Sequence, residues 1–172
     1  NYKKAISISD GVVRPELFSF ASDAMRQLSW FISDPKEYAE ILKNAREMAI
    51  QAVGYGDTSI ELQSKLGSIY YKLFKNSSRM GEIDEEALSD ALFYTRVSGS
   101  RGNVHSVVKL AAMSSFIEKH FRNFKDIFKK YDIKDSRKYW EDAADVVVRK
   151  KEDGHDVLSN RKGNEKSRKR SK

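Results

Sequence analysis

The sequence predicts an all-α protein, a single helical bundle of about six helices. Proline is rare, with 2 in 172 residues, and glycine is modest, with 9. Apolar residues recur at steps of three and four in several segments, and no strand-like alternation extends beyond a few residues. These observations favour helices packed around one core, so we expect one domain over residues 1–152 and a tail at 153–172.

The first two helices are expected to form an antiparallel pair. Pro15 suits the first turn of a helix that continues to Ile32, and Ser33-Asp34-Pro35 then ends it and caps a second helix running to Gly54. The residues expected to face inward on the first helix are Leu17, Phe20, Ala21, Ala24, Leu28, Phe31 and Ile32.

A third helix should begin after Asp57-Thr58-Ser59 and end near Asn76. Its apolar stripe includes Leu66, Ile69 and Leu73, whereas Lys65 and Lys72 lie two turns apart and point away from that stripe. A fourth, short helix follows the acidic residues 84–86, which suit a helix N-terminus, and ends near Val97.

The glycine and serine segment Ser98–Gly102 is expected to break the chain between helices. Asn103 can cap a fifth helix that presents small residues inward, a further helical piece spans 123–131, and Asp135-Ser136 caps a last helix carrying Tyr139, Trp140, Ala143 and Ala144. From Asp153 onward apolar residues nearly vanish, so we expect a disordered basic tail over 153–172.

Composition excludes several classes of protein. There is no cysteine, which removes disulfides, thiolate metal sites and thiol nucleophiles, and agrees with a cytoplasmic location. No window reaches about 18 apolar residues, so we expect no membrane partner.

Charge is unevenly distributed along the chain, whose net charge is +7. Residues 1–64 hold 7 basic and 9 acidic side chains, residues 65–130 hold 12 and 7, and residues 153–172 hold 7 and 3. A basic middle behind an acidic front suggests contact with a polyanion, although a solvated lysine-rich surface would give the same pattern.

Catalytic and metal-binding patterns are weak, so we expect no enzyme, no cofactor and no metal site. The three histidines, His105, His120 and His155, lack metal-ligand spacing, and no phosphate-binding or nucleophile motif occurs. The alternative is a helical ribonuclease of the HEPN type, in which Arg101 and His105 would share one helix face and act on a phosphodiester.

Basic side chains of the middle segments are the stronger candidates for function. If the helices that carry them are neighbours, they could neutralise several phosphates without reading sequence, because no base-reading motif is present. Lys75 and Lys125 accompany the predicted RNA-binding set, which is Lys65, Lys72, Arg79, Arg96, Arg101, Lys109 and Arg122.

Four segments resemble the small helical subunit of type III CRISPR effector complexes, of the Csm type. They are YAEILKNAREMAIQAV, GDTSIELQSKLGSIYYKLF, EEALSDALFYTRVSGSRG and RKYWEDAADVVVRKK. By this similarity Thr58-Ser59 opens a helix, Tyr94, Arg96 and Arg101 match a tyrosine and arginine segment, and Glu141 and Ala143 match the terminal helix.

The resemblance implies a non-catalytic small subunit of an antiviral ribonucleoprotein complex. Its partners would be the guide and target RNA backbone, the other effector subunits, and copies of itself stacked head to tail. A remaining alternative is a viral or plasmid nucleic-acid-packaging protein, in which the basic tail from Arg161 to Lys172 would dominate binding.

Overall fold

The computed structural model describes residues 14–152, with side chains described for 14–146, and the predicted tail at 153–172 lies outside this range. The all-α prediction is confirmed, since the described residues form seven α-helices and no strand. The elements are α2 (Pro15–Leu28), the short 3-10 turn η1 (Ser29–Phe31), α3 (Pro35–Gly54), α4 (Ile60–Arg79), α5 (Glu85–Ser100), α6 (Val104–His120), α7 (Phe124–Tyr131) and α8 (Ser136–Glu152).

The predicted helix starts are confirmed by side-chain caps. Asp34 caps α3, Ser59 caps α4, Asp84 caps α5 and Asn103 caps α6, each accepting a hydrogen bond from a backbone amide two or three residues later. These bonds satisfy amides that have no partner within the helix, so they fix where each helix begins.

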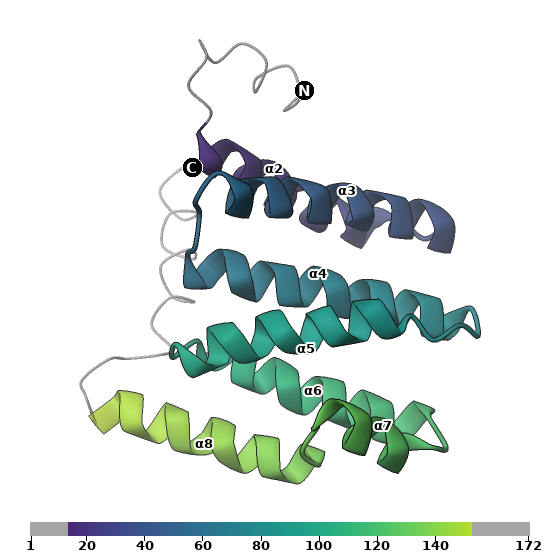
Figure 1. Cartoon of the computed structure of the whole chain (residues 1–172), viewed down its shortest axis with the longest axis vertical. Coiled ribbons are helices and arrows are strands. Elements are labelled where there is room, and N and C mark those ends of the chain that lie inside the picture. Colours follow the sequence, from purple (N-terminus) through teal and green to yellow (C-terminus); the bar gives the residue numbers. More distant parts are fainter. Residues whose placement is uncertain (1–13, 153–172) are drawn as a thin grey trace, which may run out of the picture.

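The helices lie side by side in one stack, from the α2 and α3 pair at one end to α8 at the other (Figure 1). Short connections make successive helices antiparallel, and α4 occupies the middle. It packs most extensively on α5 and then on α3, while α2 and α6 touch it more sparsely. One side of α4 is therefore left partly uncovered between α2 and α6.

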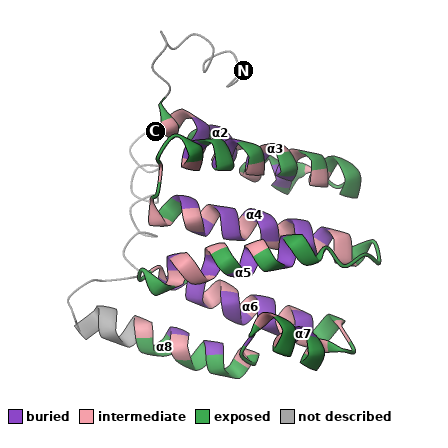
Figure 2. Cartoon of the chain, viewed as in Figure 1, coloured by how far each residue is buried: buried purple, intermediate pink, exposed green. Residues whose placement is uncertain are grey.

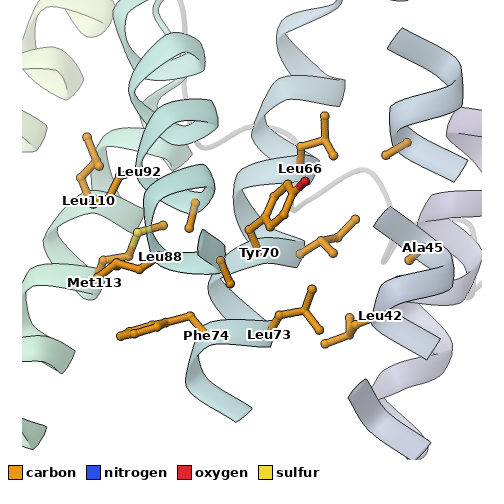
Figure 3. Close-up of a cluster of buried hydrophobic side chains, with 14 of the residues drawn as sticks. Leu42, Ala45, Leu66, Tyr70, Leu73, Phe74, Leu88, Leu92, Leu110 and Met113 are labelled. Atoms are coloured by element: carbon orange, nitrogen blue, oxygen red, sulfur yellow. The ribbon is translucent and has the colours of Figure 1, made fainter. Parts of the chain in front are cut away.

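The core explains which side of α4 remains uncovered. Leu66, Tyr70, Leu73 and Phe74 point into a buried cluster that includes Leu42 of α3 and residues of α5 and α6 (Figure 3). Buried and partly buried positions alternate along most of α4 (Figure 2). Because these residues occupy the faces toward α3 and α5, the remaining face carries the lysines.

The prediction for the inward face of the first helix is wrong at three positions. Phe20, Leu28 and Phe31 are 64%, 54% and 83% exposed, and the buried residues of α2 are Phe18, Ala21 and Ser22. α2 lies at the end of the stack with α3 as its main neighbour, so only a narrow stripe is covered. The α-helix also ends at Leu28, and the 3-10 turn redirects the residues that follow. Trp140 of α8, predicted inward, is half-exposed as well.

Two helices extend further than the sequence indicated. α4 continues to Arg79 and α5 to Ser100, so the break between α5 and α6 is confined to residues 101–103. Serine hydroxyls near both ends donate to backbone carbonyls one turn earlier, as Ser78 does to Phe74 and Ser100 does to Val97. A serine that bonds back in this way can remain helical instead of starting a turn.

Candidate nucleic-acid interface

The partly uncovered side of α4 carries four basic residues, Lys65, Lys72, Lys75 and Arg79, which we call the basic stripe. Steps of seven, three and four residues keep them on one side of the helix. The three lysines are partly buried and Arg79 is exposed. At 1.5 Å per residue the stripe extends about 21 Å along the helix axis.

On one side of the stripe lie the end of α2 and the turn η1. Lys72 Nζ lies 3.4 Å from Ser29 Oγ and 5.5 Å from the centre of the Trp30 ring. Arg26 of α2 contacts the same ring, with its guanidinium carbon 5.9 Å from the ring centre. Arg26 and Lys72 therefore meet at Trp30, from two different helices.

On the other side of the stripe lies α6, which contributes Lys109. Its ammonium donates to Ser64 O at 3.0 Å and to Ser64 Oγ at 3.1 Å. Ser64 in turn belongs to a buried row of hydroxyls, since Ser106 Oγ lies 3.0 Å from Ser64 Oγ and 2.6 Å from Ser98 Oγ. This row joins α4, α5 and α6 and holds Lys109 against α4.

Burial makes two of these lysines unusually weak bases. Burial, with a smaller contribution from the positive charge of Arg26, lowers the pKa of Lys72 to about 8 and that of Lys109 to about 8. Burial, with Arg79 nearby, also lowers the pKa of Lys75. The shared effect of Arg26 indicates that the cations from α2, α4 and α6 form one electrostatic cluster.

Acidic neighbours do little to offset this cluster. Asp23 forms an ion pair with Arg26 at 2.7 Å, and although burial opposes ionisation, Arg26 and then Lys65 lower the pKa of Asp23. Within residues 14–146 no carboxylate forms an ion pair with the basic stripe or with Lys109. Partly buried cations usually have an anionic partner, so the cluster has the charge to accept one from outside.

Four of the predicted RNA-binding residues, Lys65, Lys72, Arg79 and Lys109, thus lie on or beside the basic stripe. Arg122 is exposed at the connection between α6 and α7, next to Phe121. Phe121 lines a pocket of about 270 Å³ together with Lys75, Arg79, His120 and two other residues, and this places Arg122 near the end of the stripe that Arg79 forms.

Arg96 and Arg101 lie elsewhere and already have protein partners. Arg96 donates to the carbonyls of Tyr131 and Asp132, where α7 ends in a left-handed residue. Arg101 caps the end of α5 and donates to Thr58 O at 2.9 Å. Both arginines satisfy backbone carbonyls of connecting segments, which is a structural role.

We expect Arg96→Ala to lower the free energy of unfolding by about 1–3 kcal/mol, because two carbonyls at the end of α7 lose a charged donor. Arg101→Ala removes one exposed hydrogen bond and should cost less than about 1 kcal/mol. Urea denaturation measures both values. A larger loss for Arg101→Ala than for Arg96→Ala would contradict this assignment.

Arg101 and His105 do not share a helix face. Arg101 is the residue that ends α5, whereas His105 is exposed in the first turn of α6, after Gly102 with its φ of 90° and Asn103. The helix break therefore separates the two residues on which a ribonuclease of the HEPN type would depend.

Sequence reasoning missed Arg26 and Trp30. Both lie in the first predicted helix, residues 15–32, which is outside the basic middle of the chain at residues 65–130. Their spacing of four residues, next to an apolar face, is a weak signal. Only the packing of α2 beside α4 brings them to Lys72.

Within residues 14–152 no helix is both long and apolar enough to span a bilayer. No cluster of three or more acidic or histidine side chains in the described part of the chain could hold a metal ion. No family model, curated protein or solved structure matches this chain.

Proposed function

We propose that the protein binds the backbone of RNA along the basic stripe, as a non-catalytic subunit of a ribonucleoprotein complex. The observation that carries the proposal is a row of cations with no ion-pair partner among residues 14–146. Lys65, Lys72, Lys75 and Arg79 follow one side of α4, and Lys109 adjoins them from α6.

Phosphate groups suit this surface because the cations are numerous, close together and partly desolvated. A phosphate oxygen can accept from an ammonium in a charge-assisted hydrogen bond, which is stronger where water is partly excluded. Lys72 makes one long hydrogen bond, 3.4 Å to Ser29 Oγ, among the described residues, although an ammonium can donate three. It retains donors for a ligand.

The geometry favours contact with the backbone instead of base edges. Three of the four stripe cations are lysines, which donate from a flexible point charge, and within the stripe only Arg79 has a forked guanidinium of the kind that reads base edges. A length of about 21 Å corresponds to roughly six stacked nucleotides at 3.4 Å each. We therefore infer binding with little dependence on sequence.

The resemblance of four segments to the Csm-type small subunit supports a more specific proposal. The chain would line guide and target RNA within a CRISPR effector complex, leave cleavage to other subunits, and stack on copies of itself. Head-to-tail contact between copies suits the charge distribution of the chain. Residues 1–64 hold 7 basic and 9 acidic side chains, whereas residues 65–130 hold 12 basic and 7 acidic ones, so opposite charges could meet.

Binding to RNA over a salt series tests the proposal. Neutralisation of four to six phosphates should give a slope of about −3 to −4 in a plot of log affinity against log salt for single strands. Unrelated RNA sequences of equal length should bind alike. A flat salt dependence, no binding at low salt, or tighter binding to DNA of the same length would contradict RNA-backbone binding.

A further inference from the structure

Aromatic side chains border the basic stripe on both sides. On the side of α2, the Trp30 ring is 66% exposed and lies 5.5 Å from Lys72 Nζ. On the side of α6, Phe116 and His120 have ring centres 4.4 Å apart, and Lys75 Nζ lies 5.2 Å from the centre of Phe116. On each side, the centre of an aromatic ring thus lies within 5.5 Å of the ammonium nitrogen of a stripe lysine.

Trp30 is unusual among the exposed aromatic residues because it is held by two cations. Arg26 approaches its ring as well as Lys72, at 5.9 Å. A tryptophan that served only to complete the core would be covered, yet this ring remains two-thirds exposed beside the most desolvated part of the stripe. Cation contacts orient the indole and leave surface for a planar ligand.

Near α6, the Phe116 and His120 rings line a pocket. The pocket of about 270 Å³ is lined by Lys75, Arg79, Phe116 and His120, with Ser78 and Phe121 completing it. A planar group that enters this pocket would meet the His120 ring, which is exposed, while the adjacent cations remain free to contact a phosphate.

We propose that the ligand of the basic stripe is a single strand, whose bases stack on Trp30 and on the His120 and Phe116 pair while its phosphates contact the stripe. The inference rests on the proposed RNA binding and narrows its substrate class to unpaired RNA, so within an effector complex the stripe would hold an unpaired stretch of guide or target and not their duplex. Bases in a duplex are already stacked and turned inward, so only an unpaired strand can use the rings. The combination of a cationic track with flanking aromatic rings is the physical basis of binding to single-stranded nucleic acids.

Tryptophan fluorescence provides the test, in a Trp140→Phe background so that Trp30 is the remaining tryptophan. The ligands are a uridine decamer, a deoxyuridine decamer, a decamer of abasic sugar phosphates and a ten-base-pair RNA duplex. We expect the uridine decamer to quench Trp30 and to bind about tenfold more tightly than the abasic decamer or the duplex. The deoxyuridine decamer differs from the uridine decamer in the sugar alone, and tighter binding to it would contradict RNA binding.

Variants separate stacking from charge. Trp30→Ala should weaken uridine binding about tenfold, leave binding of the abasic decamer unchanged and preserve the salt slope, whereas Trp30→Phe should retain most of the affinity. His120→Ala should cause a smaller loss, about threefold. Trp140→Ala in the native background is the matched control, since this tryptophan is also exposed but lies on α8, and it should change nothing.

Three results would overturn the inference while leaving RNA binding intact. They are equal affinity for single strand and duplex, equal quenching by the abasic decamer, and an equal loss for uridine and abasic ligands in Trp30→Ala. Self-association that Trp30→Ala abolishes without any change in RNA affinity would identify Trp30 as a protein contact and would also overturn it. If no oligomer binds at low salt, the proposed function itself fails.

Discussion

A protein in which Lys72 and Lys109 are both replaced by methionine is expected to bind RNA about 100-fold more weakly than the native chain at physiological salt. Both ammonium groups are partly desolvated and belong to the cluster around Arg26. A hydrogen bond to a charged group contributes about 1.5–3 kcal/mol, so the loss of two such contacts accounts for a change of this size. Titration of a labelled RNA decamer measures it.

The same two lysines should make RNA binding depend on pH. Their pKa values are about 8 in the free protein, and a bound phosphate favours the charged ammonium, so binding takes up protons above that pH. Affinity should therefore fall as the pH rises from 7 to 9, by roughly tenfold for each lysine that contacts a phosphate. The double variant should show little dependence over this range, whereas ordinary exposed lysines titrate near 10.4 and would give none.

Unfolding of the protein cannot explain a fall in RNA affinity between pH 7 and pH 9. The folded pKa values of Lys72 and Lys109 lie below the unfolded value, so the unfolded chain binds more protons between about pH 8 and 10.5 and the free energy of unfolding rises over that interval. Stability should then increase while RNA affinity decreases. Buried tyrosines such as Tyr71, whose pKa burial raises to about 12, oppose this trend above pH 10, so measurements belong below pH 9.5.

A matched control replaces two exposed lysines of α3, Lys36 and Lys43, by methionine. This change removes the same net charge from a helix outside the proposed interface, and we expect less than a threefold loss of affinity. If the two double variants lose affinity equally, RNA responds to overall charge and the basic stripe is not the site. If the native protein binds equally well at pH 7 and pH 9, Lys72 and Lys109 do not contact phosphate.

The sequence predicts the helices well because their signals are local. Asp34, Ser59 and Asn103 each stand immediately before an apolar stripe, and a cap needs only an amide two or three residues away. The inward face of α2 was predicted wrongly because its exposure depends on how many neighbours that helix has. Phe20 and Phe31 follow a helical period, yet no element of the described structure covers them.

In the candidate site, too, some features follow from local sequence and others depend on tertiary packing. The placement of Lys65 and Lys72 on one face follows from the helical period alone. Lys109 and Arg96 both donate to backbone carbonyls, and only the positions of their partners, 45 and 35 residues away, put Lys109 beside the stripe and Arg96 at the end of α7. In the sequence Lys65, Lys72, Lys109 and Arg96 are equivalent cations, and only tertiary packing separates those of the proposed interface from the one that supports the end of α7.

Gly67→Ala is expected to lower the free energy of unfolding by about 2 kcal/mol, although alanine is the better helix former by about 1 kcal/mol. Gly67 lies where α4 packs on α5, and a Cβ atom there would lie 2.3 Å from Thr95 Oγ1 and 3.0 Å from Thr95 N. Thr95 is fully buried and β-branched, so its side chain has little freedom to move away. The backbone contact can be relieved only if the two helices separate. Urea denaturation at neutral pH measures the change.

Gly99→Ala is the matched control because it makes the same substitution within α5. Its added Cβ would meet Val107 Cγ2 at 3.5 Å, an ordinary packing distance, so the gain in helix propensity should stabilise the protein by up to about 1 kcal/mol. Adding Thr95→Ala to Gly67→Ala should recover part of the loss, because Oγ1 is removed while the backbone nitrogen remains. If both glycine variants shift stability in the same direction, close approach at Gly67 does not govern the α4 and α5 contact. That contact supports the basic stripe from behind, since the buried face of α4 packs on α5 and the opposite face carries Lys65 and Lys72.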